Sequence, residues 1–368
     1  MKGKKFIWGF LSLLVVYLIL VQSSCPPDDD DETTLTTNVY LSGNTTSTAG
    51  FATPCYWKNG IRSELSCPAD KNGVATSLFV SGNSVYVAGY TSTGASNAFV
   101  PCYWKDGARS DLPIGTALKG VASQIVVSGS DVYISGMVGS TGTSVPCLWK
   151  NGVRSDLVSM TAEGGSAHGI CIEGSDVYLS GSIMNNDSLF VPCYWKNGAR
   201  TDLSIMTINR FCFAGGIAVS GSDIYVAGYD QNLAHVAPDR PFLWKNGVRT
   251  SLTMDYATDY DGNAGSVFIS GTDVFVSGSV FKLSSNAKVP CYWKNNIRTE
   301  MTMVIDASKN SYSSSVFVFE NDVYLAGSSE NSAGVCVPCY WKNGTRTDLS
   351  VLDAAKNGFS GSIFVLKN

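Results

Sequence analysis

Residues 149–156 read Trp149-Lys150-Asn151-Gly152-Val153-Arg154-Ser155-Asp156, and this phrase recurs along the chain. Every copy has a tryptophan, a two-residue turn and an arginine, and most copies end on an acid. The seven copies begin at Trp57, Trp104, Trp149, Trp195, Trp244, Trp293 and Trp341. Successive copies are therefore 45 to 49 residues apart. A fixed period of this length indicates one supersecondary unit stacked on its own copies.

The residues around Trp149 predict two consecutive hairpins. Residues 122–136 alternate, are rich in β-branched side chains and contain a Ser-Gly-Ser-Asp turn, which predicts a first pair of strands. Residues 145–157 contain Asn151-Gly152, a pair typical of a tight hairpin because both central residues need a positive φ. Each unit is then four short antiparallel strands, and such units repeating at this spacing are typical of β-propeller blades.

The two ends of the chain supply one further blade between them. Residues 38–43 read as a second strand with no first strand before it, and residues 362–366 read as a first strand with nothing after it. Pairing them removes two unpaired edges, which proteins avoid. The sequence therefore predicts an all-β fold: a seven-bladed β-propeller over residues 38–368, closed by pairing of the N- and C-terminal strands.

The Asn-Gly turn also predicts which side chains of the repeated phrase share a face. In the first copy Trp57 lies opposite Arg62, and Cys55 lies opposite Glu64. Cross-strand partners and residues two apart lie on one side of a sheet. We expect the guanidinium to stack on the indole with the carboxylate beside it. Because every blade carries this cluster, we interpret it as a structural element rather than as a binding site.

Residues 1–24 have the anatomy of a secretory signal: early lysines, an apolar run over 6–21, then small residues. The sequence Gln22-Ser23-Ser24-Cys25 resembles the end of a bacterial lipoprotein signal. That resemblance implies that Cys25 is lipidated and becomes the first residue of the mature chain. An ordinary signal peptide, or an uncleaved anchor with a chance cysteine, is the alternative.

Residues 25–37 contain the run Pro26-Pro27-Asp28-Asp29-Asp30-Asp31-Glu32. A like-charged run cannot bury its side chains, so we expect a solvated tether behind the lipid. Its position also resembles the signal that sends lipoproteins of some Gram-negative bacteria to the outer face of the outer membrane; a plain spacer is the alternative. The implied location is the bacterial outer membrane, surface-exposed and lipid-anchored, with the membrane as partner through Cys25.

Composition limits the classes of ligand. The chain is 15% charged with a net charge of −4, so it carries no basic footprint for nucleic acid. Its only histidines are His168 and His235, which we expect in loops. Two histidines give little support to a metal centre with several histidine ligands or to a histidine-dependent hydrolase. Asp259, Asp261 and Asn263 have the alternating oxygens of a calcium loop, although a solvated turn is favoured. We expect no cofactor and a monomer.

Six cysteines occupy one position of the repeat: Cys55, Cys102, Cys147, Cys193, Cys291 and Cys339. Packed sheets lie about 10 Å apart, and a disulfide needs Cα atoms within about 7 Å. We therefore expect these six to be buried free thiols. Cys67, Cys171, Cys212 and Cys336 lie outside the pattern and could pair.

Blade topology places the two tight hairpin turns on one face of the ring and the two longer connections on the other. The longer connections differ between copies, and variation on a rigid scaffold is where binding specificity usually lies. The candidate ligand-binding residues in these connections are Arg210, Phe211, His235, Arg240, Asp255, Tyr256, Asp259, Tyr260 and Asp261.

The succession of a second strand, a glycine, a loop and a tryptophan resembles the kelch propeller repeat. In this chain it reads Val85-Tyr86-Val87-Ala88-Gly89 followed by Trp104, with Tyr90 where kelch repeats have a second glycine. The resemblance covers residues 38–368 at the level of architecture. Kelch relatives include both enzymes and adaptors, so it implies no active site.

Three hypotheses for function follow. The leading one is a non-enzymatic cell-surface propeller that binds a glycan or a protein through its variable-loop face. The second is a polysaccharide-acting enzyme, a lyase or glycosidase, with carboxylates among Asp255, Asp259, Asp261, Asp306 and Asp353; a glycosidase needs two carboxyl groups about 5–9.5 Å apart. The third is a purely structural interaction scaffold.

Overall fold

The computed structural model describes residues 35–92, 94, 98–140, 142–157, 164–205, 210–232, 238–302 and 308–368. Cys25, the predicted signal peptide and nearly all of the predicted tether lie outside these residues. The chain divides into two units, Met1–Thr36 and Thr37–Asn368, and the second contains all of the described strands. In the described part of the chain we find no helix with the length and apolar character needed to cross a membrane.

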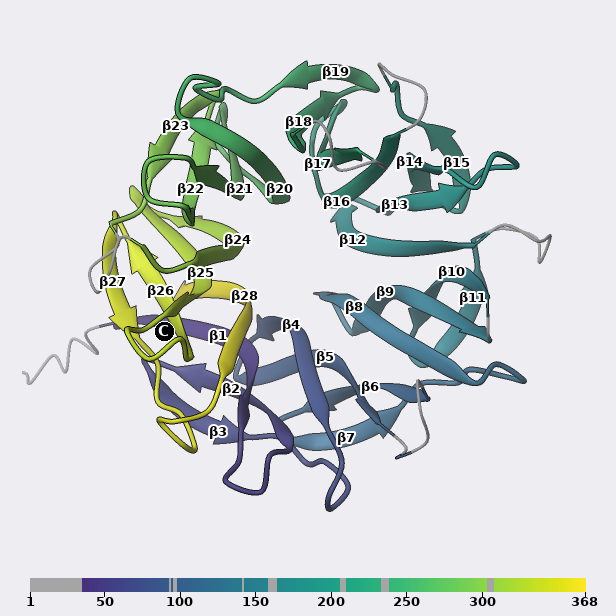
Figure 1. The fold of residues 1–368 in the computed structure, drawn as a ribbon. Coiled ribbons are helices and arrows are strands. Elements are labelled where there is room, and N and C mark those ends of the chain that lie inside the picture. Colours follow the sequence, from purple (N-terminus) through teal and green to yellow (C-terminus); the bar gives the residue numbers. More distant parts are fainter. Residues whose placement is uncertain are drawn as a thin grey trace, which may run out of the picture. The chain divides into compact units, whose positions relative to one another are not determined.

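Within the described residues, the strands form seven four-stranded antiparallel sheets arranged in a ring, as predicted (Figure 1). The innermost strands are β28 (Gly358–Lys367), β4 (Gly73–Ser81), β8 (Lys119–Ser128), β12 (Gly165–Glu173), β16 (Arg210–Ser220), β20 (Asp259–Ser270) and β24 (Ser311–Phe319). The second strands are β1 (Thr37–Thr46), β5 (Ser84–Ser92), β9 (Asp131–Ser140), β13 (Asp176–Met184), β17 (Asp223–Asn232), β21 (Asp273–Lys282) and β25 (Asp322–Glu330).

The two outer positions of each blade hold the repeated phrase. The third strands are β2 (Ala52–Lys58), β6 (Phe99–Lys105), β10 (Thr143–Lys150), β14 (Phe190–Lys196), β18 (Arg240–Lys245), β22 (Ala287–Lys294) and β26 (Cys336–Lys342). The outermost strands are β3 (Ile61–Glu64), β7 (Ala108–Asp111), β11 (Val153–Asp156), β15 (Ala199–Asp202), β19 (Val248–Ser251), β23 (Ile297–Glu300) and β27 (Thr345–Asp348).

The predicted closure of the ring is confirmed. Strand β28 pairs antiparallel with β1, and the first blade has the order β28-β1-β2-β3. Ile363 lies opposite Leu41 and Val365 opposite Val39. These four buried side chains share one apolar cluster with Trp57, so the last strand completes the core of the first blade.

The register of the repeated hairpin is also confirmed. Trp149 pairs with Arg154 and Cys147 with Asp156, and Asn151 and Gly152 have φ of 50° and 80°. The Arg154 guanidinium contacts the Asp156 carboxylate at 2.9 Å.

The predicted stacking of guanidinium on indole is wrong in detail, because the described residues show the cation on a different ring. The lysine after each tryptophan lies on the opposite face of the strand and contacts a ring of the second strand: Lys150 Nζ is 4.9 Å from the centroid of the Tyr133 ring and 2.8 Å from Asp131 Oδ2. Asn151 fixes the same turn to β9 by donating from Nδ2 to Asp131 Oδ1 and accepting the N–H of Val132, each at 2.8 Å. The phrase therefore joins three strands rather than two.

Six of the seven tryptophans in the described residues are buried against a glycine of the second strand and bonded to the connection from the preceding blade. A Cβ on Gly136 would lie 2.1 Å from the Val121 oxygen and 2.7 Å from Trp149 Cζ3, so only glycine lets the indole lie there. Trp149 Nε1 donates to the oxygen of Pro113, in the connection that arrives from β7 (3.1 Å). Five further described indoles bond in the same way: Trp57, Trp104, Trp244, Trp293 and Trp341.

The six repeat cysteines are buried free thiols, as predicted. Burial raises the pKa of Cys55 to about 12, so this thiol stays protonated and unreactive at neutral pH. The four cysteines outside the pattern are also free in the structure.

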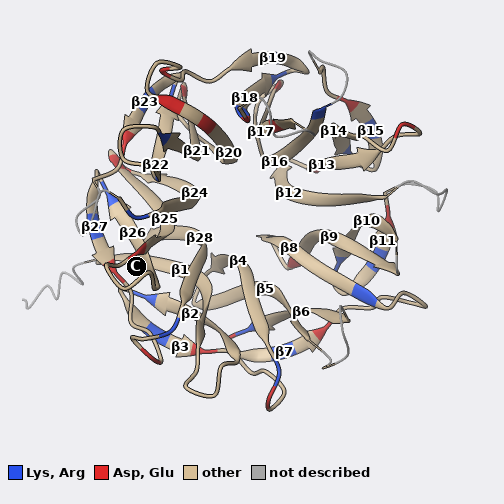
Figure 2. Ribbon diagram, viewed as in Figure 1, with Lys and Arg blue, Asp and Glu red and all other residues tan. Residues whose placement is uncertain are grey.

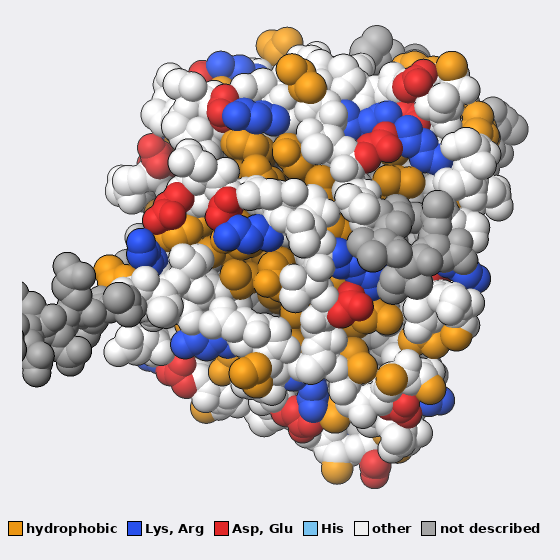
Figure 3. Space-filling model, turned by 90° about the vertical axis from the view of Figure 1, so that its left-hand side faces the viewer, with side chains coloured by type: hydrophobic (Ala, Val, Ile, Leu, Met, Phe, Trp, Pro, Cys, Tyr) orange, Lys and Arg blue, Asp and Glu red, His pale blue; other side chains and the backbone are white. Residues whose placement is uncertain are grey.

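Charged residues lie mainly on the outer strands, and the inner strands carry few of them (Figure 2). On the side of the ring shown in Figure 3, positive and negative side chains stand in small mixed groups with apolar ones between them. Repeated pairs produce this mixture, among them Lys342 with Asp322 at 2.7 Å and Arg346 with Asp348 at 2.6 Å.

Candidate functional site

Each of the seven inner strands carries an irregularity in its pairing at the same level of the ring. In β8 the pairing passes from Ala122–Gly136 to Gln124–Ser135, and Ser123 has no partner on β9. An extra residue of this kind is a β-bulge, which bends a strand and re-aims its side chains. The bulges turn a ring of residues toward the axis of the propeller.

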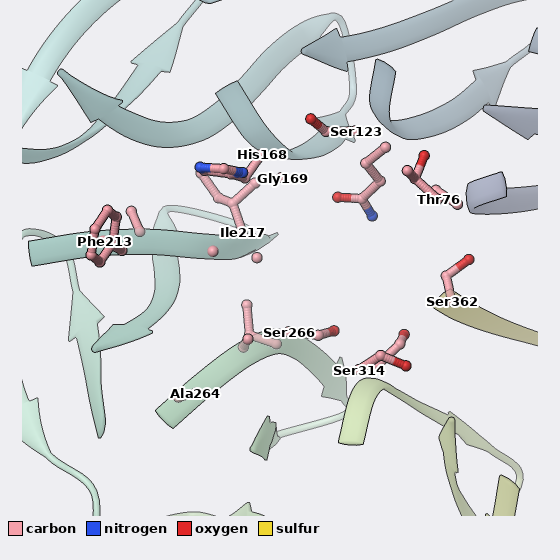
Figure 4. Close-up of a pocket in the computed structure, with 18 of the residues that line it drawn as sticks. Thr76, Ser123, His168, Gly169, Phe213, Ile217, Ala264, Ser266, Ser314 and Ser362 are labelled. Atoms are coloured by element: carbon pink, nitrogen blue, oxygen red, sulfur yellow. The ribbon is translucent and has the colours of Figure 1, made fainter. Parts of the chain in front are cut away.

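These residues line a cavity of about 560 Å³ in the central channel, with walls from all seven blades (Figure 4). Its hydrogen-bonding side chains are the hydroxyls of Thr76, Ser77, Ser123, Ser166, Ser266, Ser314, Ser315 and Ser362, the phenol of Tyr229, the amide of Gln124 and the imidazole of His168. No Asp, Glu, Lys or Arg is among the described residues that line it. The cavity therefore offers many hydrogen bonds and no compensation for a charged ligand.

Hydroxyl and amide groups on one arc of the wall also hold neighbouring blades together. Ser362 Oγ accepts the N–H of Leu78 at 2.8 Å, and Gln124 Oε1 accepts the N–H of Ile170 at 2.9 Å. Thr76 Oγ1 donates to the oxygen of Ala122 at 2.8 Å. These bonds satisfy backbone groups that the bulges leave unpaired in their own sheet and fix the wall of the cavity.

The opposite arc is formed by glycines. Gly215, Gly216 and Gly265 bring backbone rather than side chains to the cavity in the fifth and sixth blades. A Cβ on Gly216 would lie 2.9 Å from Ser266 Cα, so the two inner strands approach too closely for a side chain. The cavity is consequently lined by polar side chains on one arc and by backbone on the other.

Aromatic rings stand at the variable-loop end of the cavity. Phe190, Phe213 and Tyr229 line it, and the ring centroid of Phe213 lies 5.4 Å from that of Phe190 and 5.4 Å from that of Tyr229. Phe211 extends the cluster, 5.5 Å from Phe190. Burial, and then the nearby Asp239, raise the pKa of Tyr229, so its hydroxyl stays neutral.

His168 corrects the expectation that both histidines lie in loops. It is on β12, in the channel wall, where its side chain is exposed within the channel and the seven blades surround the channel (Figure 4). Its Nε2 is 2.8 Å from Ser166 Oγ. Enclosure lowers the pKa of His168 below its usual value, so at neutral pH the imidazole is uncharged and has one donor and one acceptor nitrogen. His235 lies outside the described residues.

The prediction that Arg210 lies in a loop is wrong. Arg210 is the first residue of strand β16, and it is buried. The fifth blade has Phe242 and Ser251 in place of the usual cysteine and acid, so Arg249 has no acid two residues on. Arg249 lies over the Phe242 ring and contacts Asp230 at 2.7 Å, and Arg210 contacts the same carboxylate at 2.7 Å. This buried group of three replaces the ion pair of the other blades.

Asp259 was also expected in a loop, but it begins strand β20 and is buried. Its carboxylate contacts Lys282 and Arg298, which both reach Glu300 as well. Burial alone would raise the pKa of Asp259, but hydrogen bonds from Arg298 and Lys282 hold it below its usual range. Asp259 is therefore an ion-pair partner within the sixth blade.

The three calcium candidates do not converge on one point. Asp259 is neutralised by Lys282 and Arg298, Asp261 Oδ1 accepts the N–H of Asp239 at 2.9 Å, and Asn263 Oδ1 accepts the N–H of Ser279 at 3.0 Å. Within the described ranges, no group of three or more His, Cys, Asp or Glu side chains is placed to hold a metal ion. Strand geometry, with its alternating faces, explains the spacing that resembled a calcium loop.

Four further candidates are exposed at the ends of strands or in connections: Arg240, Asp255, Tyr256 and Tyr260. Tyr256 is 58% exposed and Tyr260 is 41% exposed. None of the eight described candidates lines the cavity, although Phe211 contacts its aromatic end. A ligand role for the exposed four stays a prediction.

The residues of the cavity wall were missed by sequence reasoning. Their signal was present in the repeat: Thr76, Ser123, His168 and Ser314 occupy one position of the aligned inner strands, two residues before a buried aliphatic residue. Alternation places that position on the buried face, and only the bulge turns it to the channel.

No known protein-family model matches this chain, and no curated protein matches it. Among solved structures, the β-propeller domain of the Trilobed protease from Pyrococcus furiosus is similar: 8% identity over 86% of this chain and 93% of that chain, with a TM-score of 0.51. The likeness shows the fold alone. That domain is described as having an open Velcro topology, whereas here β28 pairs with β1.

Two more distant structures also match. AofleA from Arthrobotrys oligospora is 10% identical over 80% of this chain and 88% of that chain, with a TM-score of 0.45. An exo-1,5-alpha-L-arabinanase from a bovine ruminal metagenomic library is 10% identical over 65% of this chain and all (100%) of its own, with a TM-score of 0.33.

Proposed function

We propose that this protein binds a neutral saccharide at the variable-loop end of its central channel and does not cleave it. The observation that supports this is a cavity of about 560 Å³ lined by hydroxyls, an amide, a neutral imidazole and aromatic rings, with no charged residue among its described lining. Small-ligand sites commonly enclose about 300–1,000 Å³ and fix their ligand with a few polar groups.

The chemistry of the two ends of the cavity matches the two faces of a sugar. A sugar ring has an apolar C–H face, which packs on aromatic side chains such as Phe213 and Tyr229. Its hydroxyls then point toward Ser123, His168 and Gln124, which can donate and accept. A charged sugar would lose its hydration with no opposite charge to replace it.

Replacing Phe213 with alanine should weaken binding of a neutral oligosaccharide about two- to tenfold, because the C–H face of the sugar then covers roughly 20–50 Å² less apolar surface, at about 25 cal/mol for each Å². Ligands would first be found with an array of neutral and acidic oligosaccharides and then measured by isothermal titration calorimetry. Phe359→Ala is the matched control, since Phe359 is on an inner strand, is 42% exposed and lies outside the cavity lining.

Equal losses in Phe213→Ala and Phe359→Ala would contradict this site. An array on which acidic oligosaccharides bind more tightly than neutral ones would contradict the ligand class. Binding to no oligosaccharide would favour the structural scaffold.

The enzyme hypothesis has one observation in its favour. Burial, and then the Asp261 carboxylate, raise the pKa of Asp239, and a carboxyl group with a raised pKa beside a second carboxylate is what a glycosidase needs. Asp239 and Asp261 stand outside the cavity lining. Incubating the protein with the oligosaccharide that it binds, followed by mass spectrometry, separates the two functions: intact sugar supports a binding protein, and cleavage supports an enzyme.

We further propose that the propeller is held at the outer membrane of a bacterium, on the cell surface, by a lipid on Cys25. The sequence before the ring supports this, since it combines the signal-like residues with an acidic run. Cys25→Ser should move the protein from the detergent phase to the aqueous phase in a Triton X-114 partition of cells that express it. Cys67→Ser, which changes a half-buried thiol of the propeller, should not. If the Cys25→Ser variant stays in the detergent phase, the proposed lipid anchor on Cys25 is refuted.

A further inference from the structure

The channel continues past the polar cavity into a second chamber of about 440 Å³. This chamber opens toward the face of the tight hairpin turns, since Ser128 and Gly174 are part of its wall. Its side walls include the aliphatic and aromatic residues that follow the bulges on the inner strands, together with serine hydroxyls and Gln124.

Four phenylalanine rings form a continuous arc around this chamber. Phe268, Phe317, Phe364 and Phe79 come from four consecutive blades, counted from the sixth through the first to the second. Successive ring centroids are 4.6, 5.1 and 4.9 Å apart. All four rings are half-buried: each packs against a buried core cluster and also lines the chamber.

The remaining three blades close the ring of apolar side chains at the same level. The register shows the equivalence: Phe79 lies opposite Tyr86, and Ala218 lies opposite Tyr225. Val126, Cys171 and Ala218 occupy that level in the third, fourth and fifth blades. Every blade thus contributes an apolar side chain at this level, and the serine hydroxyls and Gln124 that also line the chamber lie at other levels of the inner strands.

The two chambers are parts of one channel. Seven residues line both of them: Ser77, Gln124, Ile217, Ser266, Val267, Ser315 and Ser362. No charged residue is among the described lining of the second chamber either. Along its axis the channel therefore gains aliphatic and aromatic side chains, while the shared serine hydroxyls and Gln124 continue into the second chamber.

We propose that the channel binds an amphiphile, with a neutral polar head in the first chamber and an apolar chain or aglycone among the four phenylalanines. The position of the head rests on the proposed saccharide site, whereas the apolar end is argued from the second chamber alone. Covering half-buried aromatic rings with hydrocarbon removes apolar surface from water, and this is favourable in proportion to the area covered.

A series of methyl, butyl and hexyl β-glucosides, titrated by calorimetry below their critical micelle concentrations, tests the proposal. Affinity should rise with chain length by up to about fourfold for each methylene that becomes fully buried. Ala218→Phe should abolish this rise and leave the affinity for methyl glucoside unchanged, because a fifth ring at this level fills the chamber. The substitution suits the fold, since four blades already have phenylalanine there. Ala199→Phe, on the exposed outer strand β15, is the matched control.

The neutral dye N-phenyl-1-naphthylamine, which has no sugar, separates failure of this proposal from failure of the saccharide site. Its fluorescence should increase with the wild type and with Ala199→Phe, and not with Ala218→Phe. That result without glucoside binding would leave the apolar chamber standing and refute the saccharide head. Equal dye binding by all three proteins, no dye binding by the wild type, or an affinity that is flat across the glucoside series would overturn the proposal.

Discussion

Deleting residues 358–368 should prevent the propeller from folding. The deletion removes strand β28, and with it the partners of β1 and two buried side chains, Ile363 and Val365. Losing a buried aliphatic side chain costs about 2–5 kcal/mol, and a whole domain is stable by only about 5–15 kcal/mol. We expect no cooperative thermal transition in circular dichroism and, because the unfolded chain is expanded, earlier elution on size exclusion than for the full chain.

A synthetic peptide of residues 358–368 gives this experiment its control. Added in trans, it should pair with β1 and restore the cooperative transition at high peptide concentration. The conservative variant Ile363→Val should remain folded and lose about 0.5–1.5 kcal/mol. A truncated chain that melts at the temperature of the full chain would show that the ring is stable without its closing strand.

Asp230→Asn should destabilise the protein by about 3–5 kcal/mol. The side chains of Arg210 and Arg249, which are 7% and 5% exposed, both contact the Asp230 carboxylate. Removing its charge leaves two buried cations without a counter-charge, and breaking a buried ion pair in this way is far more costly than removing both partners. Urea unfolding followed by tryptophan fluorescence measures the change.

The control is Asp223→Asn in the same blade. Asp223 contacts Lys245 at 2.7 Å on the surface, and exposed pairs of this kind are screened by water. We expect little change in the unfolding midpoint for this variant. If Asp223→Asn and Asp230→Asn shift the midpoint equally, the buried group in the fifth blade does not have the stabilising role assigned to it.

The fold could be predicted from the sequence because its signals are local and repeated. Asn151-Gly152 needs a conformation that only a few residues adopt, so it fixed both the turn and the pairing of Trp149 with Arg154. The number of copies of this phrase also predicted the number of blades. The unpaired strands at the two chain ends then left only one way to close the ring.

The candidate site was harder to predict, because its wall depends on where strands begin and bend. Arg210 and Asp259 follow variable connections and look like loop residues, yet each begins a strand and is buried against charges from neighbouring strands of its own blade. Ser123 and His168 look like ordinary strand residues, yet bulges turn them to the channel. Alternation carries no information on a bulge, since one extra residue reverses the faces after it.

The hydrogen bonds that six of the described indoles donate to the connection before them have a consequence for unfolding. Linear repeat arrays behave as chains of nearest-neighbour couplings, so their end units fray and need capping. Here the coupling runs also from the last blade to the first, because Trp57 Nε1 donates to the oxygen of Ser350 at 2.7 Å. Every blade in the ring therefore has a neighbouring blade on both sides, and there is no end unit. Local opening at any blade must therefore break two interfaces at once, and this favours a single cooperative transition of the whole ring.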